Sequence, residues 1–166
     1  MNVVAWHSDG LLATGGDDGT VRVWEASDQG RAHEVGRLLT GHKDPVWSAA
    51  WGSDGLPASG GDDGTVRVWD VSDQEHARVI GQPLSGHDGV VNEVAWGPDG
   101  LPASGSGKGT VRVWDVRKLL WLRAHAYEEA CRLAGRGLTE SEWRQFVSRT
   151  NVDPYRDTCG DQRPAG

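Results

Sequence analysis

Apolar and polar residues alternate in short runs through the first 116 residues of the chain. The run 110–115 reads Thr-Val-Arg-Val-Trp-Asp, so two valines alternate with polar or aromatic neighbours. A period of two residues is typical of a β-strand that is covered on both faces. Asp-Gly pairs separate many of these runs, and they supply the positive φ that tight hairpins require. The pattern predicts short antiparallel strands joined by tight turns.

The same pattern returns every 45 residues. Gly-Asp-Asp-Gly-Thr-Val-Arg-Val-Trp occupies residues 16–24 and 61–69, and an altered copy, Ser-Gly-Lys-Gly-Thr-Val-Arg-Val-Trp, occupies residues 106–114. Ala-Trp pairs, Asp-Gly-Leu turns and two Gly-His pairs recur in the same register. Each unit holds three strands and, in the first two units, a looser segment (31–39 or 77–84) that can form a fourth. A fixed period of this length is the signature of a repeat architecture.

With four strands to a unit, a Gly-His pair between units and a Trp-Asp pair near the end, the sequence resembles the WD40 repeat family of β-propellers. The resemblance covers residues 2–116. It implies an all-β fold, a partial β-propeller of about three four-stranded blades (2–39, 46–84 and 91–116) arranged as an open arc. It also implies a non-enzymatic scaffold that binds protein partners.

The number of units is small for this architecture, because propellers typically close with four to eight blades. The third unit lacks an evident outer strand, and the chain begins inside a first strand. Three arrangements stay open. The chain is the C-terminal piece of a longer propeller, two copies associate into a six-blade ring, or the three blades form a marginal open arc.

The resemblance assigns a buried polar network to each blade. The network links the histidine of the Gly-His pair, a Ser or Thr of the second strand, the turn Asp and the third-strand Trp. Its members are His42, Ser59, Asp63 and Trp69 in the second unit, Thr14, Asp18 and Trp24 in the first, and His87, Ser104 and Trp114 in the third. Lys108 replaces the Asp of the third unit. Since such a network rigidifies a core only when every member is satisfied, the third blade is expected to be the least rigid.

Positions that differ between the repeats are free to serve function. Trp47 is the largest difference, because Asn2 and Asn92 hold the equivalent positions. By resemblance, the loop before each first strand and the residue before the turn Asp lie at the binding rim of a propeller. The predicted partner-binding rim contains Lys43, Asp44, Pro45, Trp47, Asp88, Val90, Asn92, Asp17 and Asp62. Trp47 is then either an aromatic hot spot in an acidic rim or a residue packed between blades.

Three patterns resemble a hydrolase triad, a phosphate-binding loop and a calcium site. The repeat explains each pattern better than these functions do. Ser, His and Asp recur with the fold period, which favours a structural network over a hydrolase. The segment 105–110 is no phosphate-binding loop, because Pro102 stands where that motif needs Gly and Gly109 where it needs Ser or Thr. The paired Asp residues lack further carboxylates at calcium-ligand spacing. No enzyme activity, metal or cofactor is expected.

Charge and hydropathy restrict the classes of partner that the chain can bind. The formal net charge is −7, and the repeat region carries most of the acidic excess. An acidic surface argues against a nucleic-acid partner, and no apolar run approaches a membrane span. With no leader sequence at the N-terminus, a cytoplasmic location is expected. Cys131 and Cys159 are then expected to be free thiols, with a disulfide as the alternative.

Repeat patterning stops after residue 116. Residues 117–159 are expected to form a small C-terminal α-helical extension, with one helix over 119–133 and a second opening at the capping box 139–142. Residues 160–166 are expected to form a frayed end. The extension resembles the segment that follows the last blade in many bacterial, notably actinobacterial, WD40 proteins, often signalling chains with an ATPase or kinase domain. A truncated or split regulatory segment of such a protein is the alternative function, and covering the last blade is the simplest role of the extension.

Overall fold

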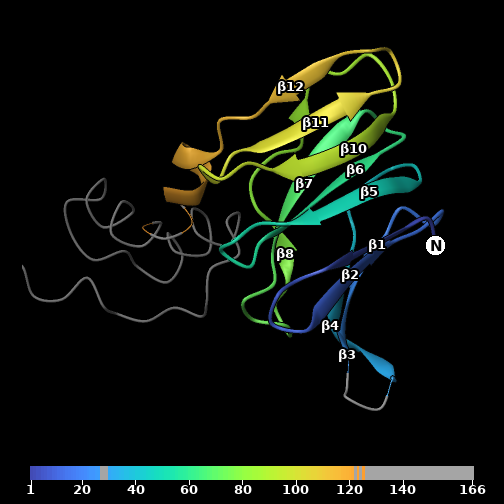
Figure 1. Cartoon of the computed structure of the whole chain (residues 1–166), viewed down its shortest axis with the longest axis vertical. Helices are drawn as coiled ribbons and strands as arrows, with labels where there is room; N and C mark the ends of the chain where they lie inside the picture. Colours follow the sequence, from blue (N-terminus) through green and yellow to red (C-terminus); the bar gives the residue numbers. More distant parts are fainter. Residues whose placement is uncertain (27–29, 122, 124, 126–166) are drawn as a thin grey trace, which may run out of the picture. The chain divides into compact units, whose positions relative to one another are not determined.

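The computed structural model describes residues 1–26, 30–121, 123 and 125. Its strands form three antiparallel sheets, and within each sheet the strands follow one another in chain order (Figure 1). The chain divides into two compact units, residues 1–116 and residues 117–166, and all the described strands belong to the first. The predicted all-β fold, a partial β-propeller, is therefore correct for the repeat region.

The first blade is a complete four-stranded sheet. Its strands are β1 (Val3–Trp6), β2 (Leu11–Gly15), β3 (Val21–Ala26) and β4 (Ala32–Leu39), and they pair in that order. The turn between β2 and β3 is closed by Gly19 at a φ of 71°, and Gly64 and Gly109 repeat this conformation at 72° and 77°. Only glycine adopts such angles without strain, which explains why the Asp-Gly pair or its Lys-Gly counterpart marks every copy of this turn.

The second blade has an interrupted outer edge. Its inner strands are β5 (Val46–Trp51), β6 (Pro57–Gly61) and β7 (Thr65–Asp70). The outer position is shared by two short strands that both pair with β7, β8 (Arg78–Val79) and β9 (Leu84–Ser85). Gly81 at a φ of 70° and Pro83, which has no N–H to donate, separate the two pieces. The predicted single strand across 77–84 is therefore two.

The third blade has three strands, and the last is an edge. They are β10 (Val91–Trp96), β11 (Pro102–Ser106) and β12 (Val111–Val113). Val111 and Val113 of β12 are 78% and 66% exposed, whereas the equivalent Val66 and Val68 of β7 are 0% and 1% exposed. The difference follows from the outer strand, because among the described residues β12 pairs only with β11.

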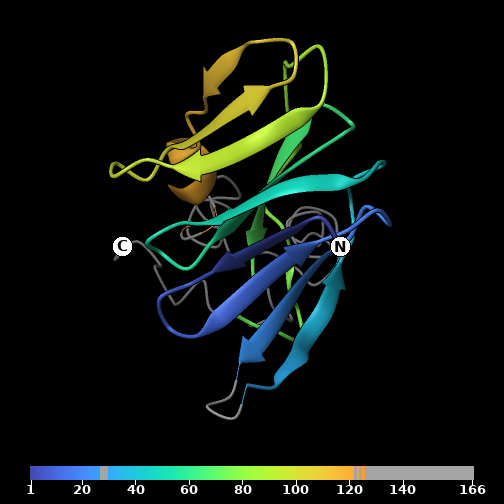
Figure 2. The same ribbon diagram turned by 45° about the vertical axis from the view of Figure 1, so that its right-hand side comes forward.

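The three sheets stack on one another through their first strands, as Figure 2 shows. Trp51 of β5 donates its indole N–H to the carbonyl of Ala5 in the first blade (3.0 Å), and Trp96 of β10 donates to the carbonyl of Ala50 (3.2 Å). The core around the first two blades contains Val21, Val23, Leu39, Val46, Trp69 and Val71. Burial of these apolar side chains is the main force that holds the blades together.

A helix follows the third blade, with residues 117–121, 123 and 125 in helical conformation. It starts two residues before the predicted position. The rest of the predicted extension, including the second helix, Cys131 and Cys159, lies outside the described residues. No helix in the described part of the chain is long and apolar enough to cross a membrane.

Candidate interaction rim and the polar networks of the blades

The second blade holds a closed chain of hydrogen bonds. His42 places Nδ1 at 3.0 Å from both carboxylate oxygens of Asp63, and its Nε2 lies 2.8 Å from Ser59 Oγ. Trp69 donates its indole N–H to the same Ser59 Oγ at 2.8 Å. A neutral imidazole that donates from Nδ1 to Asp63 accepts the Ser59 hydroxyl proton at Nε2. Every polar group of the set is then satisfied, as a buried network requires.

Burial sets the protonation states in this network. Burial lowers the pKa of His42, and the negative charge of Asp63 opposes that shift only in part. Burial alone would raise the pKa of Asp63, but hydrogen bonds from the Thr65 hydroxyl and the Lys43 backbone N–H outweigh it and leave the pKa low. At neutral pH the blade therefore contains a neutral imidazole beside a charged carboxylate.

The lowered pKa of His42 predicts a pH-dependent stability. A histidine held neutral in the folded state stabilises the fold above its ordinary pKa of 6.5, and that contribution is lost as the pH falls below it. We expect the free energy of unfolding to decrease between about pH 7.5 and pH 5.5 and to decrease less in His42→Gln. Urea denaturation across this pH range measures the free energy of unfolding of both proteins. His33→Gln, at an exposed site, is the matched control, and an unchanged pH slope in His42→Gln would contradict the assignment.

The first blade repeats half of this network. Trp24 donates its indole N–H to Thr14 Oγ1 at 2.9 Å. The Asp18 carboxylate accepts hydrogen bonds from the backbone N–H and hydroxyl of Thr20 and from Arg22 Nη2, at 3.1, 2.7 and 2.9 Å. A pocket of about 330 Å³ lies between these two groups. The structure thus brings Thr14 and Trp24 together but leaves open space between Thr14 and Asp18.

The third blade keeps its histidine in place without the Asp. His87 Nε2 lies 2.7 Å from Ser104 Oγ, which also accepts the indole N–H of Trp114 at 2.8 Å. The Nδ1 atom faces the hydroxyl of Thr110 at 2.8 Å. This hydroxyl takes the place of the turn Asp carboxylate, which is absent because Lys108 stands at that position. The sequence contains a sign of this partner, since the same Thr follows the Asp-Gly or Lys-Gly turn in all three units. A neutral hydroxyl makes a weaker hydrogen bond than a carboxylate does.

We expect the third blade to exchange its amide hydrogens fastest of the three. Its network lacks the charged acceptor, and β12 is an open edge whose valines are exposed. Exposed backbone hydrogen bonds and few buried contacts mark low local stability. Hydrogen exchange followed by mass spectrometry compares residues 111–114 with residues 66–69. Stronger protection of 111–114 would contradict the expectation.

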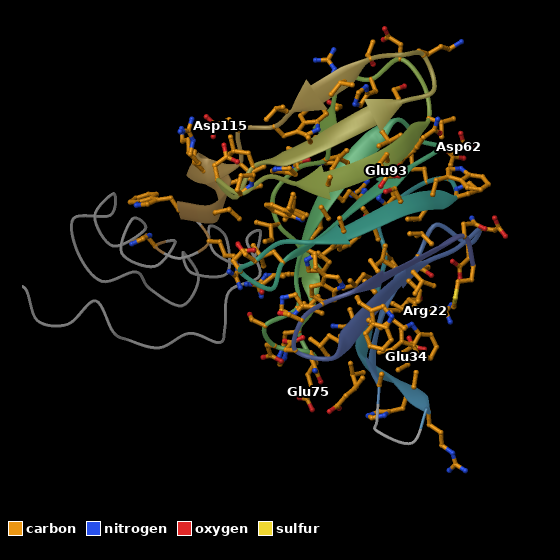
Figure 3. All side chains as sticks on the ribbon, in the orientation of Figure 1. Arg22, Glu34, Asp62, Glu75, Glu93 and Asp115 are labelled. Atoms are coloured by element: carbon orange, nitrogen blue, oxygen red, sulfur yellow. The ribbon has the colours of Figure 1, made fainter. Side chains whose placement is uncertain are left out.

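The predicted rim residues lie where the first strand of each blade begins. The backbone N–H of Asp62 donates to the carbonyl of Pro45 at 2.8 Å, so the loop before β5 contacts the turn after β6. The Asn2 amide donates to Asp17 at 2.9 Å in the first blade, and the Gly107 N–H donates to the carbonyl of Val90 in the third. Figure 3 shows Asp62 at this margin and Glu75 at the other end of the same blade. The structure thus joins the two segments of the rim in each blade.

Trp47 is 44% exposed, while its neighbours Val46 and Ser48 are buried. The indole therefore presents a large apolar surface on a strand that is otherwise fixed in the core. The predicted rim also contains four exposed acidic side chains, Asp17, Asp44, Asp62 and Asp88. An accessible aromatic ring among charges has the composition of an interface hot spot. That role stays a prediction.

The Ser59, His42 and Asp63 set has the wrong surroundings for a hydrolase. Ser59 is fully buried, and its hydroxyl oxygen is occupied by the indole N–H of Trp69. A nucleophile must reach a substrate carbonyl and have an oxyanion site beside it. The hydrogen bonds of this set serve the packing of the blade.

The segment that was compared with a phosphate-binding loop is also part of the blade, because residues 107–110 form the turn between β11 and β12.

Repeated antiparallel sheets of three to five strands, each with one hydrogen-bonded Trp on its third strand or directly after it, define a β-propeller type of repeat protein. The family model described as "WD domain, G-beta repeat" matches residues 1–25, 34–70 and 78–115. The chain belongs to the WD40 repeat family. A search of curated proteins finds no match to it.

Proposed function

We propose that the protein is a non-enzymatic scaffold that binds another protein through the rim around Trp47. WD40 repeats generally mediate protein–protein interactions. The observation that carries the proposal is the exposure of Trp47 at a position where the other two repeats have Asn. Because the blade accepts Asn there, packing does not require the indole.

The surroundings of Trp47 indicate what kind of partner fits. The exposed carboxylates of Asp17, Asp44 and Asp62 attract a positively charged surface and speed its approach. The indole supplies apolar area at a small cost in conformational entropy. The partner therefore presents an apolar socket ringed by Lys or Arg side chains.

Affinity capture with Trp47 variants tests the proposal. The full chain, Trp47→Ala and Trp121→Ala are compared by quantitative mass spectrometry of the bound proteins. Trp121 is a suitable control because it is another exposed indole, 48% accessible, that is not part of the rim. We expect partners that are retained by the full chain and by Trp121→Ala and lost from Trp47→Ala. Equal retention by Trp47→Ala, with its stability unchanged, would contradict the role of the rim.

Two further features belong to the proposal. A bacterial signalling context rests on the resemblance of the C-terminal extension, most of which lies outside the described residues. The alternative function in that context is a truncated or split regulatory segment of a signalling ATPase or kinase, without activity of its own. Association with a second copy or with further repeats rests on the small number of blades.

A further inference from the structure

Six Asp-Gly pairs occur in the chain, and five of them share one local structure. The five pairs are 9–10, 18–19, 54–55, 63–64 and 99–100, and the sixth is 88–89. In each of the five, the aspartate carboxylate accepts a hydrogen bond from the backbone N–H two residues later, at 3.1 to 3.4 Å. This arrangement is an Asx turn.

The glycine N–H is also hydrogen-bonded in all five pairs. It donates to the carbonyl three residues earlier, at 3.1 or 3.2 Å. The glycine itself has a φ between 71° and 93°, a conformation that glycine adopts without strain. The carboxylate and the amide nitrogen of these pairs are therefore each fixed in a tight turn by a separate partner.

The sixth pair has neither of these hydrogen bonds. Asp88 is exposed, and no residue in the described part of the chain forms a hydrogen bond with its carboxylate or with the N–H of Gly89. Gly89 does not share the positive φ of the five turn glycines. The loop is nevertheless fixed on both sides, because the His87 imidazole is hydrogen-bonded within the blade and the Val90 carbonyl accepts a backbone N–H at 3.0 Å.

An Asp-Gly pair whose groups are not held in place can rearrange with water as the only other reactant. The glycine nitrogen attacks Cγ of the protonated aspartate carboxyl, a C–N bond forms, and the hydroxyl group leaves with the N–H proton as water. Water then opens the resulting succinimide ring. Breaking the bond between nitrogen and Cγ restores aspartate, whereas breaking the bond between nitrogen and the main-chain carbonyl carbon gives isoaspartate. Glycine favours the attack because it has no Cβ to hinder its nitrogen.

We propose that Asp88 is a modification site, at which the chain isomerises spontaneously to isoaspartate, and that the Asx turns protect the other five Asp-Gly pairs. In those turns, two hydrogen bonds must break before the nitrogen can reach Cγ. The hydrogen bond from the Thr20 hydroxyl also lowers the pKa of Asp18, so the protonated carboxyl that the reaction requires is scarce there. The sixth pair has neither form of protection.

Isoaspartate at this position changes the predicted partner-binding rim, to which Asp88 and Val90 belong. The isoaspartyl linkage adds the side-chain methylene to the backbone and converts the side-chain carboxylate into a main-chain one. Because the loop is fixed on both sides, the added atom displaces the residues between the two fixed points. The effect on binding rests on the proposed function, whereas the rearrangement itself needs no partner.

A measurement of isoaspartate at each Asp-Gly pair tests the proposal. The folded full chain and the chain unfolded in guanidinium chloride are incubated at physiological temperature and neutral pH. Peptide mapping with electron-transfer fragmentation then quantifies isoaspartate at all six pairs. We expect similar rates at the six pairs of the unfolded chain. In the folded chain, the rate at Asp88 should exceed the rate at each of the other five by about tenfold or more, because two hydrogen bonds hold each of those pairs.

Gly89→Ala provides the matched variant. The added Cβ would lie 3.0 Å from Cγ of the flexible Lys108 side chain, which can move, and it hinders the attacking nitrogen. Isoaspartate at Asp88 should form several-fold more slowly in this variant, with the rates at the other five pairs unchanged. A rate at Asp88 in the folded native chain that is no higher than the rates in the five Asx turns would overturn the proposal. Since no partner enters the experiment, failure of the rim around Trp47 would not affect its outcome.

Discussion

Replacing Trp69 with alanine is expected to destabilise the protein by about 3–5 kcal/mol, as for other large aromatic residues in a core. Trp69 is 0% exposed and belongs to the core shared by the first two blades. The substitution leaves a cavity and also removes the donor to Ser59 Oγ. Because a domain of this size has a total stability of only about 5–15 kcal/mol, a large share of the molecules should unfold at moderate temperature.

Two comparisons separate the contributions of Trp69. Trp69→Phe keeps most of the volume and loses the hydrogen bond, so we expect a smaller cost of about 1–3 kcal/mol. Trp114→Ala removes the equivalent residue of the third blade, which is only half-buried, and should cost less than Trp69→Ala. Urea denaturation of the three variants measures these values. A cost for Trp114→Ala equal to or above that for Trp69→Ala would show that burial is misassigned.

Gly60→Ala should destabilise the protein by about 1–3 kcal/mol through overpacking between blades. An added Cβ at Gly60 would lie 2.4 Å from Val91 Cγ1 of the next blade, and at Gly15 it would lie 2.5 Å from Val46 Cγ1. Both glycines are on second strands and face the neighbouring sheet. They allow β10 and β5 to approach closely, so neither site has room for a methyl group.

Gly105 provides the matched control for this prediction. It occupies the same position in the third blade, where an added Cβ would meet only Glu93 Cβ, at 4.0 Å. Gly105→Ala should therefore be neutral or stabilise the fold by up to about 1 kcal/mol, because alanine reduces the freedom of the unfolded chain. Thermal unfolding of Gly60→Ala and Gly105→Ala measures the two effects. Equal effects at Gly60 and Gly105 would contradict the stacking of the second and third blades.

The period of the sequence predicted most of the fold because one unit repeats the same local chemistry three times. Strand alternation and the Asp-Gly turns fix the hairpins within a unit, and matching positions such as Trp51 and Trp96 make the same contact in successive units. The split of the outer strand into β8 and β9 was not predicted. It arises from Gly81 and Pro83, which interrupt pairing in a segment that does not follow the repeat.

The polar networks were predictable only in part. Family resemblance indicated the set His42, Ser59, Asp63 and Trp69, and the structure places these groups within hydrogen-bond distance of one another. The substitution of Lys108 suggested an unsatisfied histidine in the third blade, whereas Thr110 faces its Nδ1 atom. The pocket beside Thr14 depends on which side chains surround an open space, and linear spacing does not reveal that.

Residues that hold the blades and residues that are free to bind are distinct in this protein. Positions that recur in every unit, such as the third-strand Trp, have hydrogen-bond partners inside the fold. Trp47 does not recur and is partly exposed. A change at Trp47 should therefore alter binding with little effect on stability, as is usual for surface substitutions, while a change at Trp69 should do the reverse.

The central claim is that this scaffold binds its partner at the rim around Trp47. Hydrogen exchange of the full chain, measured with and without the captured partner, tests it most directly. The account predicts slower exchange in residues 43–48 and 88–92 in the complex, with little change in the outer strand β4. Protection confined to β4, with the exchange of 43–48 and 88–92 unchanged, would contradict it.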